Sequence, residues 1–492
     1  MAKKKAKTKV KAAGGALDML VRQFAQPLAC LRELVQNSID AGSNQVDISL
    51  AREREGIRLS VSDTGEGMTE HIIETQLTRL FASSKEGDLT KVGKFGIGFV
   101  SVFALDPLAV VVDTGRQGES WRVLFKTDRS FELLKLPHSV EGTTVHLYLD
   151  ADRFEIPSLR NKVRETLSFW CRHCRAEIFV DGLPIRSPFQ LQEPIQAAYE
   201  ETGTRLVLAL SRQAECFYGY YNQGLTLLEG TQSPIAHVTF KIDSRYFEHT
   251  LTRDNVIQNE DYVKGMALLK RVLHEQYPPK LFEHLRNGGE DWELLKILAD
   301  LGVPSEQEPL FADFQGRFYA LAELRRALVC CQDEQDELSR AVHDPGQNRL
   351  VLKLSQAAAA WLRQRGLNLE ATAQRWRFCQ PDDSLEPLLA LCAQLGKTLG
   401  VRRLRAVRWI SPAPGPLLFP AAKVGLMLTS ETGDLLLLDV NHPGCADLLR
   451  LQEWKAPLAA QVLLQHLILH LPEEQREQRA QSLATAMLGQ FR

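Results

Sequence analysis

The chain has 492 residues, of which 44% are hydrophobic and 24% charged, a composition typical of soluble globular proteins. This length is too great for one core, and we expect about three domains. The formal net charge of −2 provides no overall attraction to nucleic acid or to anionic membranes. The sequence also lacks the apolar run of about 20 residues that a membrane-spanning helix needs, so composition argues against membrane proteins.

The first eleven residues, MAKKKAKTKVK, contain six lysines. Because no apolar segment follows them, they are neither a signal peptide nor a membrane anchor. We interpret residues 1–16 as a flexible, solubilising tail, with a nucleic-acid or lipid contact as the alternative.

The nine cysteines do not form a disulfide framework. The segment CRHC, from Cys171 to Cys174, has the spacing of half a zinc site, but no second pair follows at a suitable distance. We therefore do not expect zinc there. The cysteine usage fits a reducing cytoplasm.

The first predicted domain, residues 17–190, mixes helices with strands joined by hairpins. These elements predict an α/β sandwich, with helices on one face of a mixed, mainly antiparallel sheet. The expected helices cover residues 17–40, 98–105 and 158–173, and the expected strands 45–54, 56–63, 108–115, 120–127, 131–136, 142–149 and 176–182.

Two further domains are expected. Residues 191–290 carry alternating segments at 204–211, 216–230 and 237–247, then a loop and one long helix over 261–286. This pattern predicts an α/β middle domain. Residues 291–492 are rich in Leu and Ala and predict a mainly helical domain, with a strand at 433–441 and two amphipathic helices between about 445 and 490. The overall fold class is therefore α+β.

An unusual polar face occurs in the segment LRELVQNSID, residues 31–40. Glu33, Asn37 and Asp40 are spaced i, i+4 and i+7, so they share one face of the predicted helix. Two glycine clusters follow, DTGEGM at 63–68 and GKFGIGF at 93–99. Glycines let the backbone approach a ligand closely, and the second cluster opens a helix whose positive end suits phosphate. Either cluster alone indicates only a turn.

The order of these motifs is more specific than any one of them. A helix with ExxxN, a strand ending in DxGxG, a GxxGxG segment opening a helix, and GTT at 142–144 opening a strand resemble the GHKL ATPase superfamily, which shares the Bergerat nucleotide-binding fold. The segments LRELVQNSIDA, FASSKEG and GKFGIGFVSVFAL, together with HTLTRDNVIQNEDY in the middle domain, resemble the heat shock protein 90 family in its HtpG-like bacterial form.

The resemblance implies an ATP site with Mg²⁺. Asn37 would offer an amide oxygen to the metal, and Glu33 would orient or deprotonate the attacking water. Asp63 would accept from the adenine amine and so reject guanine, and Arg253 would reach the γ-phosphate. For Asp40, a ribose or base contact and a local bond remain equal alternatives. The implied nucleotide-binding residues are Asn37, Asp40, Asp63, Gly67, Met68, Lys85, Gly93, Lys94, Phe95, Gly96, Ile97, Gly98, Phe99 and Thr143.

On this resemblance we expect a cytoplasmic, homodimeric, ATP-driven chaperone that acts on unfolded or client proteins. The alternative is a MutL-like or topoisomerase-like ATPase in DNA metabolism, which the lysine-rich tail favours and the near-neutral charge opposes. A non-hydrolysing nucleotide-binding scaffold would lack the base, whereas Glu33 is present. One departure concerns the base pocket, because Glu66 stands where the family usually has an apolar residue.

Overall fold

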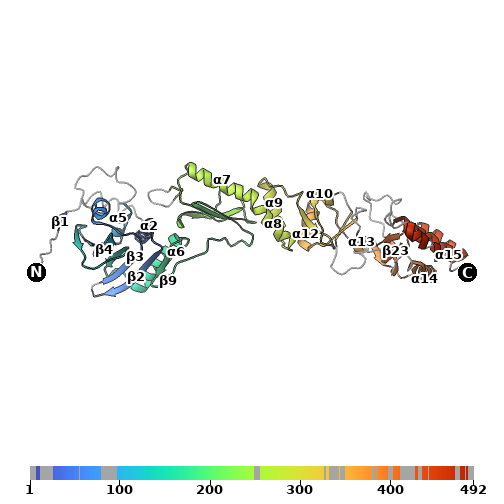
Figure 1. Cartoon of the computed structure of the whole chain (residues 1–492), viewed down its shortest axis with the longest axis horizontal. Helices are drawn as coiled ribbons and strands as arrows, with labels where there is room; N and C mark the ends of the chain where they lie inside the picture. Colours follow the sequence, from blue (N-terminus) through green and yellow to red (C-terminus); the bar gives the residue numbers. More distant parts are fainter. Residues whose placement is uncertain are drawn as a thin grey trace. The chain divides into compact units, whose positions relative to one another are not determined.

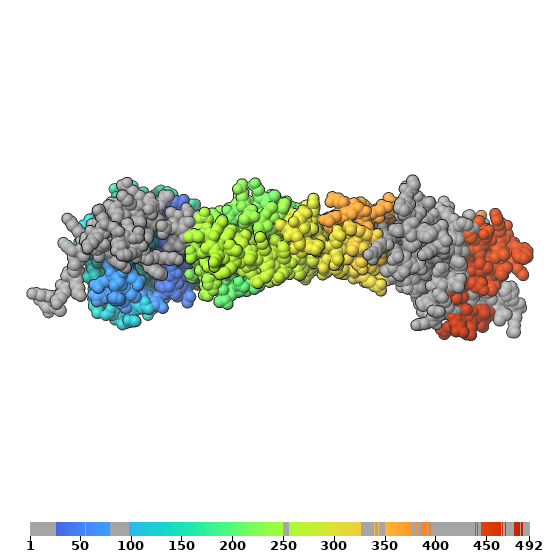
Figure 2. Space-filling view, turned by 90° about the horizontal axis from the view of Figure 1, so that it is seen from above, coloured from blue at the N-terminus to red at the C-terminus, as the bar shows by residue number. Residues whose placement is uncertain are grey.

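The computed structural model describes the residues that are coloured in Figure 1, and Figure 2 gives a space-filling view of the same chain. The chain forms two compact units, Met1–Tyr277 and Pro278–Arg492. The described residues are 7–10, 26–54, 56–78, 97–248, 255–325, 328–331, 339, 343, 349–378, 380, 383, 385–396, 403–409, 427–429, 435–440, 443–470, 477–482 and 484–485.

A nine-stranded sheet forms the centre of the first domain. All neighbouring strands are antiparallel except β2 and β8, which are parallel, so the predicted mixed sheet is confirmed. The strand order is β1-β6-β5-β4-β7-β3-β2-β8-β9. The strands are β1 (Lys7–Val10), β2 (Gln45–Glu53), β3 (Gly56–Asp63), β4 (Ala109–Arg116), β5 (Glu119–Lys126), β6 (Phe131–Lys135), β7 (Thr143–Leu149), β8 (Glu177–Val180) and β9 (Leu183–Pro184).

Strand β1 lies inside the segment that the sequence predicts to be a flexible tail. It pairs with β6, because an edge strand offers unpaired N–H and C=O groups to any extended segment within reach. These four residues thus form one edge of the sheet.

Two helices cover one face of the sheet. Helix α2 (Cys30–Asp40) buries Leu31, Leu34 and Val35, and packs on β3 and on α6 (Ile156–Cys171), which in turn packs on β2 and β8 (Figure 1). The predicted α/β sandwich is thereby confirmed. The helix expected over 98–105 is instead one α-helical turn, α5 (Ile97–Val100), continued by a 3₁₀ segment, η4 (Ser101–Leu105). The remaining short elements of this domain are η1 (Pro27–Ala29), α3 (Glu70–Ile72) and the π-helical turn η2 (Ile73–Leu77).

The second domain is a five-stranded sheet with α7 (Glu260–Glu275) packed on β10, β11 and β14. The single long helix expected over 261–286 is two helices in the structure, α7 and α8 (Tyr277–Arg286). The second and third residues of α8 are prolines, which lack the N–H that would continue the hydrogen bonding of α7. The strand order is β10-β11-β14-β12-β13, and only β12 and β14 are parallel. The strands are β10 (Ala197–Glu201), β11 (Thr204–Leu210), β12 (Tyr218–Asn222), β13 (Leu225–Gly230) and β14 (Val238–Ser244).

Besides most of α8, the unit that begins at Pro278 contains further helices and, among its described residues, three small sheets. Its helices are α9 (Glu293–Asp300), α10 (Leu321–Leu324), α12 (Gln356–Gln364), α13 (Thr372–Arg375), α14 (Glu386–Gly396) and α15 (Pro443–His470). Its strands are β15 (Pro309–Ala312), β16 (Phe318–Ala320), β17 (Leu328–Cys331), β18 (Arg349–Leu352), β19 (Glu370–Ala371), β20 (Trp376–Phe378), β21 (Arg403–Trp409), β22 (Met427–Thr429) and β23 (Leu435–Asp439).

Only β23 was expected among these strands. Most of the other strands have two to four residues and are too short to show alternation. Strand β21 has seven residues, but two adjacent apolar residues, Ala406 and Val407, interrupt its alternation. Helix α15 is interrupted at Lys455, whose backbone is extended, two residues before Pro457. In the part of the chain that the structure describes, no helix is both long and apolar enough to cross a membrane.

Candidate functional site

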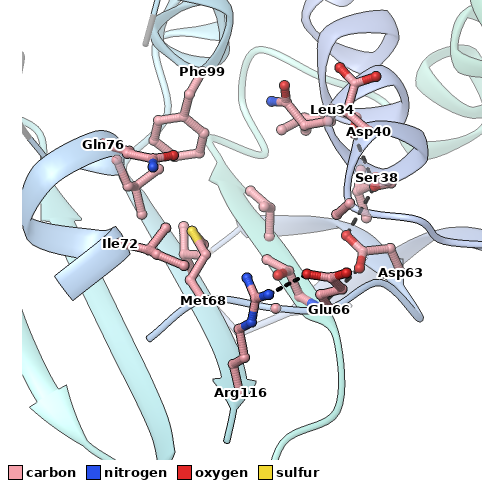
Figure 3. A pocket seen from close by; sticks show the side chains of 18 residues that line it. Leu34, Ser38, Asp40, Asp63, Glu66, Met68, Ile72, Gln76, Phe99 and Arg116 are labelled. Atoms are coloured by element: carbon pink, nitrogen blue, oxygen red, sulfur yellow. Dashed lines mark hydrogen bonds and ion pairs between the residues drawn. The ribbon is translucent and has the colours of Figure 1, made fainter. Parts of the chain in front are cut away.

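A cavity of about 340 Å³ opens between α2, the ends of strands β3, β4 and β7, and the α3–η2 turn. Its size falls within the range of small-molecule sites. Figure 3 shows Ser38, Asp40 and Asp63 on one side of the cavity, with Met68, Ile72, Phe99 and Gln76 on the other. The lining residues are Leu34, Asn37, Ser38, Asp40, Ala41, Val61, Asp63, Glu66, Gly67, Met68, Ile72, Gln76, Leu77, Phe99, Val112, Arg116, Thr143 and Val145.

Asp63, the last residue of β3, is held by three hydrogen bonds. Its Oδ1 accepts from the backbone N–H groups of Gly65 at 2.9 Å and Thr143 at 3.1 Å. Its Oδ2 accepts from the Ser38 hydroxyl at 3.0 Å (Figure 3). A carboxylate has about four acceptor positions, so one position on Oδ2 is left for a ligand. The orientation of that position is fixed before any ligand arrives.

A row of hydroxyls continues from Asp63 across the sheet. Asp63 is paired with Thr143 on β7, and Thr143 with Thr114 on β4. The two threonine hydroxyls lie 3.0 Å apart, and the Thr114 hydroxyl also accepts from the backbone N–H of Met68 at 2.9 Å. Thr114 is fully buried. It therefore fixes the backbone beneath the apolar wall of the cavity.

The glycines of DTGEGM allow this loop to lie against its neighbours. A Cβ on Gly65 would lie 2.9 Å from the Cβ of Ala41, at the end of α2, and a Cβ on Gly67 would collide with the backbone oxygen of Gly115. Gly67 also has a φ of +67°, a conformation that favours glycine. The backbone N–H of Glu66 donates to the carbonyl of Ala41 at 3.0 Å. The loop thus joins the end of α2 to the end of β3.

The polar face of α2 divides into two parts. Asn37 and Asp40 line the cavity, and the side-chain amide of Asn37 has no hydrogen-bond partner among the described residues. Glu33 does not line the cavity. It is only 6% exposed and lies against Gly98, where a Cβ would come within 2.7 Å of Glu33 Oε2. Gly98 therefore makes room for this buried carboxylate, one helical turn beyond Asn37.

The charge of Glu33 affects its neighbour on α2. Burial first, and then the negative charge of Glu33, raise the pKa of the Cys30 thiol to about 12. Cys30 therefore stays protonated and uncharged near neutral pH, and packs in the core as a small apolar side chain.

Glu66, the residue that departs from the family pattern, lines the cavity and forms an ion pair with Arg116 at the end of β4 (Figure 3). The Glu66 side chain is 65% exposed and that of Arg116 33%. An exposed pair of this kind adds little stability. It places both charges at the solvent-facing edge of the cavity, beside Met68, and leaves the apolar wall intact.

Several residues predicted for the site lie outside the described residues. Glu33 does not line the cavity, and Ile97 and Gly98 belong to α5, the helical turn that also carries Phe99. The predicted residues that line the cavity are Asn37, Asp40, Asp63, Gly67, Met68, Phe99 and Thr143. The ones outside the described residues are Lys85, Gly93, Lys94, Phe95, Gly96 and Arg253.

Ser38, Thr114 and Arg116 also line or support the cavity and were not predicted from the sequence. Ser38 could have been predicted, because it lies on the same helix as Asn37 and a serine buried in a helix needs a hydrogen-bond partner. Thr114 and Arg116 lie on a strand some fifty residues from Asp63, and no local pattern connects them to the site.

The CRHC segment begins at the last residue of α6 and leads toward β8. Cys171 and Cys174 are buried free thiols, and Nδ1 of His173 lies 3.0 Å from the carbonyl oxygen of Ser187. No group of three or more His, Cys, Asp or Glu among the described residues is placed to hold a metal ion.

Comparison with known proteins matches residues 26–135 to a family model described as histidine kinase-, DNA gyrase B-, and HSP90-like ATPase. The chaperone protein HtpG of Roseobacter denitrificans is 28% identical over 187 residues, which cover 32% of this chain and 30% of that protein. The DNA mismatch repair protein MutL of Rickettsia prowazekii is 26% identical over 135 residues, covering 27% and 21%. MutL of Streptococcus agalactiae serotype Ia is 27% identical over 311 residues, covering 59% and 45%.

The chain thus spans less than half the length of each of these relatives. The relatives divide between HtpG and MutL at similar identity, so the comparison does not single out the heat shock protein 90 family. The motif order and the matching model agree on the coarser assignment. Residues 26–135 are therefore similar to the ATPase domain of the GHKL superfamily.

Proposed function

We propose that the protein binds ATP in the cavity beside Asp63 and hydrolyses it to drive a dimeric molecular chaperone of the heat shock protein 90 type. The observation that carries the nucleotide site is the Asp63 carboxylate, held by three hydrogen bonds with one acceptor position free at the edge of a partly apolar cavity.

Adenine fits the two sides of this cavity. Its exocyclic amine donates to the remaining position of Asp63 Oδ2, where the carbonyl of guanine would be repelled. Met68, Ile72 and Phe99 supply apolar surface for the ring. Because Ser38 and the backbone hold the carboxylate in place, binding costs little reorganisation.

Asn37 is suited to hold a magnesium ion. Its side-chain amide faces the cavity and has no partner among the described residues, and oxygen ligands are the kind that Mg²⁺ prefers. When bound, the ion neutralises phosphate charge. Asp40 lines the cavity one turn further along α2, and we propose that it contacts the nucleotide directly or through water.

Glu33 is the proposed general base. It lies one helical turn before Asn37 on α2 and next to Gly98, the residue that precedes Phe99. Because Asn37 and Phe99 both line the cavity, we propose that the phosphates lie on the side of the cavity nearest Glu33. The carboxylate takes a proton from water as the water oxygen attacks the γ-phosphorus, and the bond to the bridging oxygen breaks to release ADP. We propose that Arg253 stabilises the charge on the transferred group.

The test is ATP hydrolysis and ATP binding by Glu33→Ala. Binding should persist and hydrolysis should fall by about a hundredfold or more. Glu53→Ala, an exposed change at the end of β2, is the matched control and should hydrolyse ATP normally. Full activity in Glu33→Ala would refute the assignment of the base.

Arg253→Ala should slow hydrolysis with little change in affinity for ATP.

The chaperone proposal rests on the HtpG-like motifs around α2 and Gly98, on the HtpG relative, and on a net charge of −2. An ATPase acting on DNA in the manner of MutL is the second candidate, because the MutL relative from Streptococcus agalactiae covers 59% of this chain. Turnover measured with duplex DNA and with a denatured protein separates the two. Strong stimulation by DNA alone would refute the chaperone proposal.

The proposed homodimer is supported by exposed apolar side chains on α15. Trp454 is 78% exposed, Leu458 36% and Val462 40%. Leu458 and Val462 follow the break at Lys455 and are spaced i, i+4, so they share one helical face. Light scattering should give the mass of a dimer for the wild type. A lower mass for Leu458→Glu/Val462→Glu would support association through this face, and an unchanged mass would refute it.

A further inference from the structure

A second cavity, of about 390 Å³, lies inside the unit Met1–Tyr277, between the loop that follows α2 and one end of the second domain's sheet. Residues 42–44 form its first-domain side together with Arg175. Arg205, Gln223, Asp243 and Arg245 form the side from the second domain. Three guanidinium groups and one carboxylate therefore line it.

The carboxylate that lines this cavity, Asp243, is paired with one of the three arginines. Asp243 Oδ2 accepts from Arg205 Nε at 2.9 Å, and Oδ1 accepts from the backbone N–H of Gly224 at 3.0 Å. Asp243 thus neutralises Arg205, which also stacks 4.3 Å from the ring centre of Phe189. The positive charges of Arg175 and Arg245 are left without a carboxylate inside the cavity.

Arg245 is held in place without an acidic partner. Its Nη2 donates to the Tyr246 hydroxyl at 2.8 Å, and its guanidinium lies 4.9 Å from the centre of that ring. The side chain also crosses Gly203, where a Cβ would come within 2.6 Å of Arg245 Nε. No ion pair of Arg245 occurs among the residues that the structure describes. A fixed guanidinium with no counter-charge is prepared for an anionic ligand.

The other donors at the cavity are similarly available. Arg175 pairs with Glu200 at 2.7 Å, but the two side chains are 68% and 63% exposed, and such pairs hold weakly. The side-chain amides of Asn44 and Gln223 have no hydrogen-bond partner within the described ranges. The lining thus combines donors and positive charge around a space larger than a single ion.

We propose that this cavity binds the phosphate group of a small phosphorylated solute. Guanidinium groups bind phosphate oxygens through paired, charge-assisted hydrogen bonds. The volume is in the range of small-molecule sites and leaves room for more than the phosphate. This site is separate from the cavity beside Asp63, and its ligand does not depend on the proposed ATPase activity.

The loop between the two cavities connects them. The Ser43 hydroxyl accepts from the backbone N–H of Thr64, next to Asp63, at 3.1 Å, and the carbonyl of Ala41 accepts from Glu66. A ligand that orders residues 42–44 therefore acts on the loop that carries Asp63. By linkage, phosphate and nucleotide should change each other's affinity by the same factor.

Binding is tested by calorimetry on the full chain at low ionic strength, with inorganic phosphate, glucose 6-phosphate and citrate. Wild type should bind both phosphate compounds saturably. Arg245→Gln should weaken the binding of phosphate compounds by about tenfold, and Arg175→Gln, at a more exposed position of the same cavity, should do the same. Arg186→Gln, an exposed arginine outside the cavity lining, should leave binding unchanged. Tighter binding of glucose 6-phosphate than of inorganic phosphate identifies the ester as ligand, and equal binding identifies free phosphate.

Three results would overturn the site: no saturable binding by the wild type, unchanged phosphate binding in both cavity variants, or citrate binding more tightly than either phosphate compound. Displacement of phosphate by ADP, with no effect of Arg245→Gln, would place the phosphate in the nucleotide cavity instead. The affinity for ADP should change in saturating phosphate for the wild type and not for Arg245→Gln. An unchanged affinity in the wild type would overturn the connection between the cavities.

Discussion

Replacing Asp63 with asparagine exchanges one side-chain oxygen for an amide nitrogen and leaves the shape of the residue unchanged. Oδ1 must remain an oxygen, because it accepts from two backbone N–H groups, of Gly65 and Thr143. The new NH₂ group therefore takes the place of Oδ2. It can donate to Ser38 Oγ, while the Ser38 hydroxyl donates to the carbonyl of Leu34, 3.0 Å away. The fold should accommodate this substitution with a loss of about 1 kcal/mol or less.

The same substitution reverses the polarity of the position that faces the ligand. The adenine amine loses a charge-assisted acceptor, which contributes about 1.5–3 kcal/mol, and now meets a second donor. We expect a total loss of roughly 3 kcal/mol, which corresponds to about a hundredfold weaker nucleotide binding.

Isothermal titration with ADP and with GDP measures this effect. Wild type should prefer ADP, and Asp63→Asn should lose most of that preference while its melting temperature stays close to that of the wild type. Asp113→Asn provides a matched control, because Asp113 is next to Thr114 on β4 but pairs with Arg122 and does not line the cavity. ADP binding by folded Asp63→Asn within twofold of wild type would refute the reasoning, as would equal binding of ADP and GDP by the wild type.

Three further changes test other parts of the structure. Gly98→Ala should displace the Glu33 carboxylate, 2.7 Å from the new methyl group, and slow hydrolysis about tenfold or more with a smaller change in ATP affinity; equal turnover would contradict this placement. Thr114→Val should lower the free energy of unfolding by about 1–3 kcal/mol, because the N–H of Met68 loses its acceptor, and urea denaturation measures this loss. Burial, and then the charge of Lys241, lower the pKa of His173 to about 4. The unfolded chain takes up this proton near pH 6.5, and the folded chain only near pH 4. The free energy of unfolding should therefore be highest above pH 6.5 and fall by about 2 kcal/mol as the pH drops to 4. His173→Gln, which cannot titrate, should remove this part of the pH dependence, and an identical pH profile would refute it.

The sequence by itself determined the parts of the site whose chemistry is local. The spacing along α2 placed Glu33, Asn37 and Asp40 on one face, and the DTGEGM motif placed Asp63 at the end of its strand. In the structure Asn37, Asp40 and Asp63 line one cavity, whereas Glu33 does not. Strands long enough to alternate, such as β2 through β7, were also predicted correctly, because alternation over five or more residues is visible in a sequence.

Tertiary structure alone decided what surrounds Asp63. The row from Asp63 through Thr143 to Thr114 depends on the register between strands that are far apart in the chain, and the ion pair of Glu66 with Arg116 depends on the same pairing. The second cavity likewise exists only because Arg175 and Arg245 approach the loop after α2 from separate domains. Sequence periodicity reports which way a side chain faces within its own element, and the neighbours that it meets are decided only when the elements pack.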